Sequence, residues 1–310
     1  MTGVKNFTDE EGFGFMTAAS APRIPVLMYH EIRGEAETAS PLAVAPDVFG
    51  SQLAYLHEAG FSTLTAGELA AFLSGGAGEL PERPVVLTFD DGYGDFYTAA
   101  LPVMKRYGFT GTLFQTTGSV GRTDVATRML NWRELTEIEQ AGVEIGAHTV
   151  RHPQLDQLSE RDLREELYAS KSALEDHLGL AVPGLAYPYG YSSRHVREVA
   201  RELGYTYAYV VGNAMTTGAA GTFAFPRLTV RRATTADGFR DLVNGVDTFE
   251  LRGARMLTKG FAVVRRARAA LKLGQEPAWY REAKAEDLAY PAKAADQDAA
   301  AADSAAEAAE

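Results

Sequence analysis

Short apolar runs alternate with longer amphipathic stretches along most of the chain, beginning at about Ile24. Short apolar runs are typical of buried strands, whereas apolar residues that recur once per helical turn are typical of helices that bury one face. Strands and helices that alternate in this way build a mostly parallel sheet. The pattern therefore predicts an α/β fold. The predicted strands are 24–29, 61–64, 85–89, 111–116, 143–147, 185–187, 206–211 and 228–230.

Two of the predicted helices have recognisable beginnings. Asp47 precedes a set of apolar residues with helical spacing and is expected to cap that helix. Ser159 and Asp162 open a longer helix, whose buried face includes Leu163 and Leu167. Both helices are therefore expected to pack one apolar face on the sheet.

The chain has 310 residues, which we interpret as one domain with extensions at both ends. A single α/β barrel commonly has about 250 residues. The predicted domain covers 23–250 and follows an N-terminal extension at 1–22. Residues 251–291 are interpreted as a basic amphipathic helical segment. Residues 292–310 form an acidic, alanine-rich tail that is expected to be disordered, because it has almost no large apolar residues to bury.

The segment from Arg252 to Lys272 contains seven basic residues and no acidic ones, interleaved with apolar residues. Two interpretations remain open. The segment resembles a helix that lies on anionic lipid, which would give a peripheral membrane contact. Alternatively, it packs on the domain with its basic face in water, and we favour this because short amphipathic helices are common in globular proteins.

Composition excludes several classes of protein. The net charge of −11 argues against a nucleic-acid-binding protein. With no cysteine, the chain has neither disulfides nor a thiol nucleophile. No apolar run approaches the roughly 20 residues that span a bilayer. The N-terminus lacks the basic and apolar regions of a secretory signal. A cytoplasmic location is therefore expected, with an additional peripheral location at the inner membrane face if the basic segment binds lipid.

Two adjacent carboxylates, Asp90 and Asp91, end the apolar strand at 85–89 and are followed by Gly92. Burying two like charges side by side is costly unless a cation or a proton relieves them. The strand at 143–147 ends in the same way on His148, and His152 follows four residues later. One carboxylate and two imidazoles can hold a catalytic metal and leave a position for water. The other carboxylate is then free to act as a base, and these residues alone do not decide which acid takes which role.

Three segments follow predicted strands and resemble a known set of motifs. In chain order they are Thr88-Phe89-Asp90-Asp91-Gly92, His148-Thr149-Val150-Arg151-His152 and Ala186-Tyr187-Pro188-Tyr189-Gly190. In this order they are similar to the first three motifs of the polysaccharide deacetylases, the NodB-homology family of carbohydrate esterases. The resemblance covers about 24–246. It implies a distorted (β/α)7 barrel.

The resemblance also implies roles for the site residues. Asp90 corresponds to the catalytic base, while Asp91, His148 and His152 correspond to the ligands of a divalent metal, usually zinc. Most members use a histidine late in the domain as the general acid, but between Tyr191 and Leu251 this chain has only His195, which is expected to begin a helix. That position of the pattern is therefore empty.

The segment Met28-Tyr29-His30 is similar to a segment of the PgaB and IcaB branch, in which the domain is circularly permuted. His30 is accordingly the candidate general acid, and the alternative is a structural histidine at a strand end. Many members also place an arginine at the position of Ala186 to orient the base. We nominate Arg227 to pair with Asp90 instead, and an ordinary surface or loop arginine is an equal alternative.

Tyr187, Pro188 and Tyr189 are predicted to contact substrate. Aromatic faces pack on the apolar faces of sugar rings, and the phenol supplies a hydrogen bond. The backbone N–H of Tyr189 is a candidate donor to the oxyanion. Both tyrosines could equally belong to the core.

These observations predict metal-dependent N-deacetylation of an N-acetylated amino sugar such as N-acetylglucosamine, in a polymer, an oligosaccharide or a lipid- or nucleotide-linked precursor. Asp90 would take a proton from the attacking water, and His30 would give one to the departing nitrogen. One alternative is a related hydrolase that acts on a non-sugar amide or an O-acetyl ester. Another is a carbohydrate-binding protein that kept the fold but lost turnover.

Overall fold

The computed structural model describes residues 22–34, 40–76, 79–123, 127–218, 221–249 and 251–256. Within the predicted basic segment, residues 251–256 are helical. The rest of that segment, the acidic tail and nearly all of the N-terminal extension lie outside the described residues. In the described ranges, no helix is both long enough and apolar enough to span a membrane.

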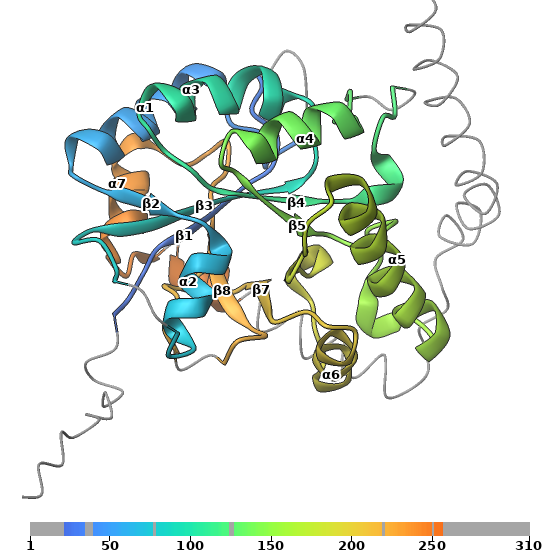
Figure 1. Cartoon of the computed structure of the whole chain (residues 1–310). Helices are drawn as coiled ribbons and strands as arrows, with labels where there is room; N and C mark the ends of the chain where they lie inside the picture. Colours follow the sequence, from blue (N-terminus) through green and yellow to red (C-terminus); the bar gives the residue numbers. More distant parts are fainter. Residues whose placement is uncertain are drawn as a thin grey trace, which may run out of the picture.

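Eight parallel strands form the centre of the molecule, and seven of them close into a barrel (Figure 1). All eight predicted strands are present, most with ends that differ by one or two residues from the prediction. The strands are β1 (Val26–Tyr29), β2 (Ser62–Leu64), β3 (Pro84–Asp91), β4 (Thr112–Gln115), β5 (Glu144–Ala147), β6 (Gly184–Ala186), β7 (Tyr207–Val211) and β8 (Phe225–Thr229).

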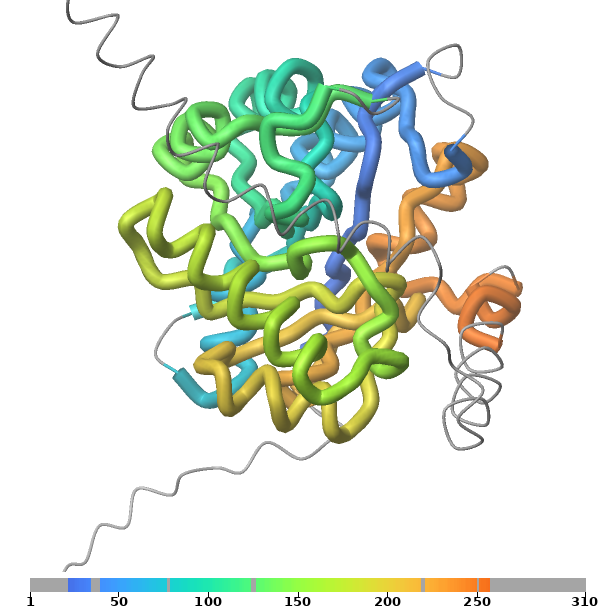
Figure 2. Tube along the Cα trace, turned by 90° about the vertical axis from the view of Figure 1, so that its right-hand side faces the viewer, coloured from blue at the N-terminus to red at the C-terminus, as the bar shows by residue number. Residues whose placement is uncertain are grey.

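The first strand closes the barrel between the last strand and β3. Tyr29 of β1 is paired with Phe89 of β3, and Met28 is paired with Thr229 of β8. Strand β2 lies outside the ring and pairs only with the first part of β3. In Figure 2 the dark-blue β1 accordingly runs through the middle of the molecule, between elements from later parts of the chain.

Helices cover the outside of the strands (Figure 1). Ser159 caps α5 by accepting a hydrogen bond from the backbone N–H of Asp162, as predicted. The predicted cap at Asp47 is wrong, because α1 begins at Pro46 and Asp47 lies in its first turn. The helices are α1 (Pro46–Glu58), α2 (Ala66–Leu73), α3 (Leu101–Arg106), α4 (Trp132–Gln140), α5 (Glu160–Leu178), α6 (Arg194–Glu202) and α7 (Ala236–Asn244), with short helical turns η1 (Phe96–Ala100), η2 (Thr117–Ser119), η3 (Leu155–Gln157) and η4 (Pro188–Gly190).

Side chains on the strands alternate between two apolar cores. Val26, Val86 and Phe225 belong to the smaller core, which fills the barrel and is covered by α2. Their chain neighbours, such as Leu27 and Leu87, pack outward in the larger core beneath the other helices. Because side chains in a strand alternate with a period of two, the even-numbered positions of β1 and β3 and the odd-numbered positions of β8 face the barrel interior.

Strand β8 begins three residues earlier than predicted, at Phe225 rather than at Leu228. Pro226 lies inside the strand and is paired with Val210 of β7. Proline cannot donate a ladder hydrogen bond, so it argues against a central strand when only the sequence is considered. The earlier start matters because it places Arg227 within the strand, on the side that faces the barrel interior.

Candidate active site

The predicted chemical groups gather at the carboxyl ends of the barrel strands. His30 directly follows β1, Asp90 and Asp91 end β3, and His148 directly follows β5. Since Tyr29 is paired with Phe89, the register brings His30 beside Asp90. Parallel strands place all their carboxyl ends at the same end of a barrel, which is where barrel enzymes build their active sites.

Asp90 and Arg227 form a buried ion pair inside the barrel. Two hydrogen bonds join the guanidinium to both carboxylate oxygens, 2.7 Å from Nη1 to Oδ1 and 2.8 Å from Nη2 to Oδ2. Nη1 also donates to the Thr88 hydroxyl at 3.2 Å. Arg227 is completely buried and Asp90 is 3% exposed. Removing one partner of such a pair costs about 3–5 kcal/mol, because the other charge is left buried without compensation.

Burial alone would raise the pKa of Asp90, but the charges of Arg227 and His148 outweigh it and hold that pKa below its usual range. Asp90 is therefore a carboxylate at neutral pH, held in one orientation by two parallel hydrogen bonds. The prediction that Arg227 pairs with Asp90 is thus confirmed. Whether it orients a catalytic base stays a prediction.

Asp91 departs from the alternation of its strand, because its φ angle is 74°. Strict alternation would point its side chain outward, away from Asp90. The left-handed backbone instead brings it to the histidines, with Oδ1 3.4 Å from Nε2 of both His148 and His152. One ligand atom from each of Asp91, His148 and His152 lies within 4.8 Å of the others, a grouping that could hold a metal ion.

Backbone strain is concentrated at this site. Asp91, Thr149, His152 and Tyr189 all have φ angles between 58° and 74°, in the left-handed region. Such residues cost on the order of 1–3 kcal/mol each and persist only where the surroundings impose them. Two of these residues, Asp91 and His152, are candidate metal ligands, and Tyr189 packs against His152. The strained backbone therefore lies at the candidate metal site.

Hydrogen bonds hold the His148 ring and the loop that carries His152. Nδ1 of His148 lies 2.7 Å from the Ala186 carbonyl oxygen, so it carries the proton and leaves Nε2 as the electron-pair donor. The loop that leads to His152 is fixed by buried Glu166 of α5, whose carboxylate accepts hydrogen bonds from the backbone N–H groups of Val150 and Arg151 at 2.9 and 3.0 Å. These contacts fix the His148 ring and the backbone that leads to His152.

The electrostatics of the three residues suit a cation. Burial would raise the pKa of Asp91, but hydrogen bonding to His148 and the nearby histidine charges hold it far below its usual range. Burial and the charge of His148 lower the pKa of His152 to about 4, so it is a neutral imidazole at pH 7. Burial would lower the pKa of His148, but the carboxylates of Asp90 and Asp91 raise it above its usual value, so a metal ion would displace a proton from His148. A carboxylate and neutral imidazoles are the forms that bind divalent metals. An aspartate with two histidines therefore fits zinc or a similar ion.

Comparison with known proteins agrees with this geometry. Residues 77–208 match the family model described as polysaccharide deacetylase. A poly-β-1,6-N-acetyl-D-glucosamine N-deacetylase of Staphylococcus aureus is 27% identical over 219 residues, which cover 67% of this chain and 73% of that protein. Residues 77–208 therefore carry a polysaccharide deacetylase domain. The family's members are hydrolases, and the resemblance inferred from the motifs is confirmed.

Solved structures of deacetylases share the fold. Streptococcus pyogenes PplD, solved with acetate, superposes with a TM-score of 0.66 at 29% identity and covers 72% of this chain and 99% of that one. IcaB from Ammonifex degensii gives a TM-score of 0.61 at 27% identity and covers 72% and 96% of the two chains. The predicted seven-stranded barrel and the likeness to the IcaB branch are therefore confirmed for this chain.

His30 is half-buried at the mouth of the barrel. Its charge lowers the pKa of both Asp90 and Asp91, although burial and closer partners have larger effects. Within the part of the chain that the structure describes, its Nδ1 is buried and has no hydrogen-bond partner. A purely structural histidine would be expected to hydrogen-bond through Nδ1, and His30 does not. Its role as the general acid stays a prediction.

The predicted substrate contacts at 187–189 divide into two groups. Tyr187 is completely buried in the larger core, with its hydroxyl 3.4 Å from the Phe223 carbonyl oxygen. Pro188 is buried as well. The prediction that the Tyr187 ring lines a sugar groove is wrong, because its strand position faces the helices. Tyr189 is 44% exposed and its ring centroid lies 4.6 Å from that of His152, so this tyrosine does face the site.

Two residues at the site were missed by sequence reasoning. The hydroxyl of Tyr93 hydrogen-bonds to Asp91, and burial together with the Asp91 charge raises the pKa of Tyr93. Glu166 holds the histidine loop, as described above. A signal existed for each: Tyr93 directly follows Gly92 of the first motif, and Glu166 is an acid on the predicted buried face of α5, next to Leu167.

Gly92 is required by its surroundings. Its φ angle is 85°, and a Cβ atom there would lie 2.0 Å from Oε1 of the fully buried Gln115. Only glycine combines this left-handed backbone with so close an approach. The turn it makes allows the chain to leave β3 immediately after the two carboxylates.

Proposed function

We propose that this protein is a metal-dependent N-deacetylase that hydrolyses the acetamide of an N-acetylated amino sugar to acetate and a free amine. The observation that supports this best is the grouping of Asp91, His148 and His152 beside the Asp90–Arg227 pair at the carboxyl end of the barrel. The activity of the Staphylococcus aureus relative, a poly-β-1,6-N-acetyl-D-glucosamine N-deacetylase, supports an N-acetylated glucosamine as the substrate class. The acetate in the PplD structure supports removal of an acetyl group.

Asp91, His148 and His152 would hold the metal, for which zinc is the first candidate. A divalent ion in such a site would supply a Lewis acid for the carbonyl oxygen and would lower the pKa of a bound water to about 7. Nε2 of His148, the ring of His152 and Oδ1 of Asp91 are already gathered, so little reorganisation accompanies binding.

Asp90 would accept the proton of the attacking water. Its carboxylate keeps free lone pairs, since Arg227 occupies one on each oxygen. Arg227 would orient this base. Its two hydrogen bonds fix the Asp90 carboxylate, so that the remaining lone pairs point in a constant direction. General-base catalysis of this kind contributes about 10²–10⁴ in rate.

His30 would protonate the departing nitrogen. Protonation is needed because an amide nitrogen that carries no added proton is a very poor leaving group. The histidine comes from β1, beside Asp90 in the register. The exposed Tyr189 is placed to contact the sugar, and its backbone N–H remains the candidate donor to the developing oxyanion. Asp90, His30 and Tyr189 would thereby supply a base, an acid and a sugar contact at the carboxyl end of the barrel.

A screen of N-acetylated sugars and oligosaccharides, scored for released acetate with and without a chelator, tests this function. We expect acetate from an N-acetylated amino sugar, lost on chelation and restored by a divalent metal. Acetate from O-acetyl esters alone would indicate the esterase alternative. A protein that holds no stoichiometric metal and releases no acetate from any substrate would contradict catalysis and favour the binding protein.

Replacing His30 by alanine is expected to separate amide from ester cleavage. The variant should keep its fold and metal and lose amide hydrolysis, whereas an activated acetate ester, whose leaving group needs no proton, should still be cleaved at a measurable fraction of the original rate. Rates on both substrates and the metal content would be compared with those of the unchanged protein. Undiminished deacetylation by His30→Ala would remove His30 as the acid.

A further inference from the structure

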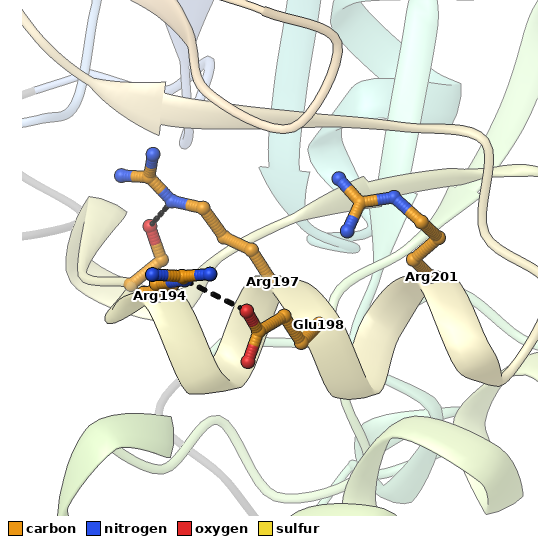
Figure 3. Close-up of a pocket in the computed structure, with 5 residues that line it drawn as sticks. Arg194, Arg197, Glu198 and Arg201 are labelled. Carbon is orange, nitrogen blue, oxygen red and sulfur yellow. Dashed lines mark hydrogen bonds and ion pairs between the residues drawn. The ribbon is translucent and has the colours of Figure 1, made fainter.

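A pocket of about 440 Å³ lies along α6, and its lining is dominated by guanidinium groups. Figure 3 shows Arg197 and Arg201 on the same side of the helix, one turn apart, with Arg194 in front of them beside Glu198. The lining residues are Ser192, Arg194, Arg197, Glu198 and Arg201.

The charges of this pocket do not cancel. Arg194 and Glu198 pair with each other at 2.8 Å and account for one charge of each sign. Among the residues that the structure describes, neither Arg197 nor Arg201 forms an ion pair. Like charges at positions i and i+4 of a helix destabilise it slightly, and a bound anion would relieve that repulsion.

Neutral partners hold both arginines. Nε of Arg197 donates to the Ser192 hydroxyl at 2.9 Å, and the guanidinium carbon of Arg201 lies 4.5 Å from the centre of the Phe223 ring. These contacts leave the terminal N–H groups of Arg197 available. A guanidinium fixed in this way matches the paired oxygens of a carboxylate or a phosphate.

The pocket is connected to the metal-binding candidates through the chain segment of η4. The Tyr189 ring lies 4.6 Å from His152, and the Tyr191 ring stacks 5.8 Å from Tyr189. Ser192, the next residue, is the one that holds Arg197. Two aromatic rings, of the kind on which sugars pack, therefore lie between the metal-binding candidates and the segment that holds Arg197.

We propose that Arg197 and Arg201 bind an anionic group, a carboxylate or a phosphate, carried by a sugar next to the one whose acetamide is cleaved. This proposal rests on the proposed function and specifies the substrate class further. The chain as a whole carries a charge of −11, so an acidic glycan is repelled by most of the molecule. A local pair of unneutralised arginines near the aromatic rings gives such a glycan a point of attachment.

The test compares three oligosaccharides of N-acetylglucosamine: a neutral one, one with a lactyl carboxylate on the neighbouring sugar, and one with a phosphate monoester there. In the variant with Arg197→Gln and Arg201→Gln, we expect the ratio of kcat/KM on the acidic to the neutral substrate to fall about tenfold or more, mainly through KM. The arm with the larger fall identifies carboxylate or phosphate. Arg240→Gln on α7 removes the same charge elsewhere and should leave the ratio unchanged.

A ratio that stays constant in the double variant, or that falls equally in Arg240→Gln, would overturn the proposal. If the unchanged protein cleaves no N-acetylated sugar, the proposed function fails while the pocket can still be judged by titration with inorganic phosphate. Saturable phosphate binding that the double variant loses and Arg240→Gln retains would support an anion site. Equal binding by all three proteins, or none by any, would contradict it.

Discussion

Replacing His148 by alanine is expected to remove most of the bound metal and, with it, the deacetylase activity. The ring is 1% exposed, its Nδ1 is committed to the Ala186 carbonyl, and its Nε2 lies 3.4 Å from Asp91. Loss of one of three protein ligands leaves too few donors to hold a catalytic ion. Metal content per chain and released acetate would be measured on the same preparation.

A matched control is available on α5. His177 is exposed and lies away from the strand ends, so His177→Ala also removes one imidazole but should leave metal content and activity unchanged. Full metal occupancy in His148→Ala would show that the site has been assigned to the wrong residues. Metal loss in both variants would point to general unfolding, which thermal denaturation would reveal.

Replacing Asp90 by asparagine is expected to lower the rate by at least about 10²-fold while leaving most of the metal in place. The amide has almost the same shape but cannot take up a proton as a carboxylate does. Asp90 is not one of the three grouped ligand residues, and both of its oxygens accept hydrogen bonds from Arg227. Asp91→Asn, by contrast, should lose metal and activity together.

The comparison of these two neighbours tests the division of roles directly. Equal metal loss in Asp90→Asn and Asp91→Asn would contradict it. Because Asp90→Asn leaves Arg227 buried without a counter-charge, some loss of stability is expected, and activity should be measured well below the unfolding transition of the variant. A rate that hardly changes would mean that another group accepts the proton.

The apolar pattern was sufficient for most of the fold. Every predicted strand exists because short apolar runs between polar helices can be buried only in a sheet that helices cover. The pattern failed at β8, where Pro226 hides the start of the strand, and at Asp47, which lies inside a helix that begins with Pro46. Both errors concern local ends, where proline restricts the backbone in more than one way.

Tyr187 shows why a single motif cannot assign a side chain to a site. It is adjacent to Pro188 and Tyr189 in a motif that follows a strand, yet its ring is completely buried. Tyr189, two residues later, has a φ angle of 59° and turns toward His152. A tyrosine suits either place, since its ring is apolar and its hydroxyl polar, so only the backbone path distinguishes the two.

The residue types at the strand ends follow from the amino-acid sequence alone: two carboxylates at the end of one strand, and a histidine after each of two others. Because parallel strands point the same way, this was enough to predict that Asp90, Asp91 and His148 meet. Only the tertiary structure separated the two acids. Closure of the barrel brings Arg227 to Asp90 across 137 positions of sequence, and a left-handed turn at Asp91 directs the second carboxylate to the histidines. Distant register and single backbone angles depend on the packing of the whole barrel, so no local pattern of residues encodes them.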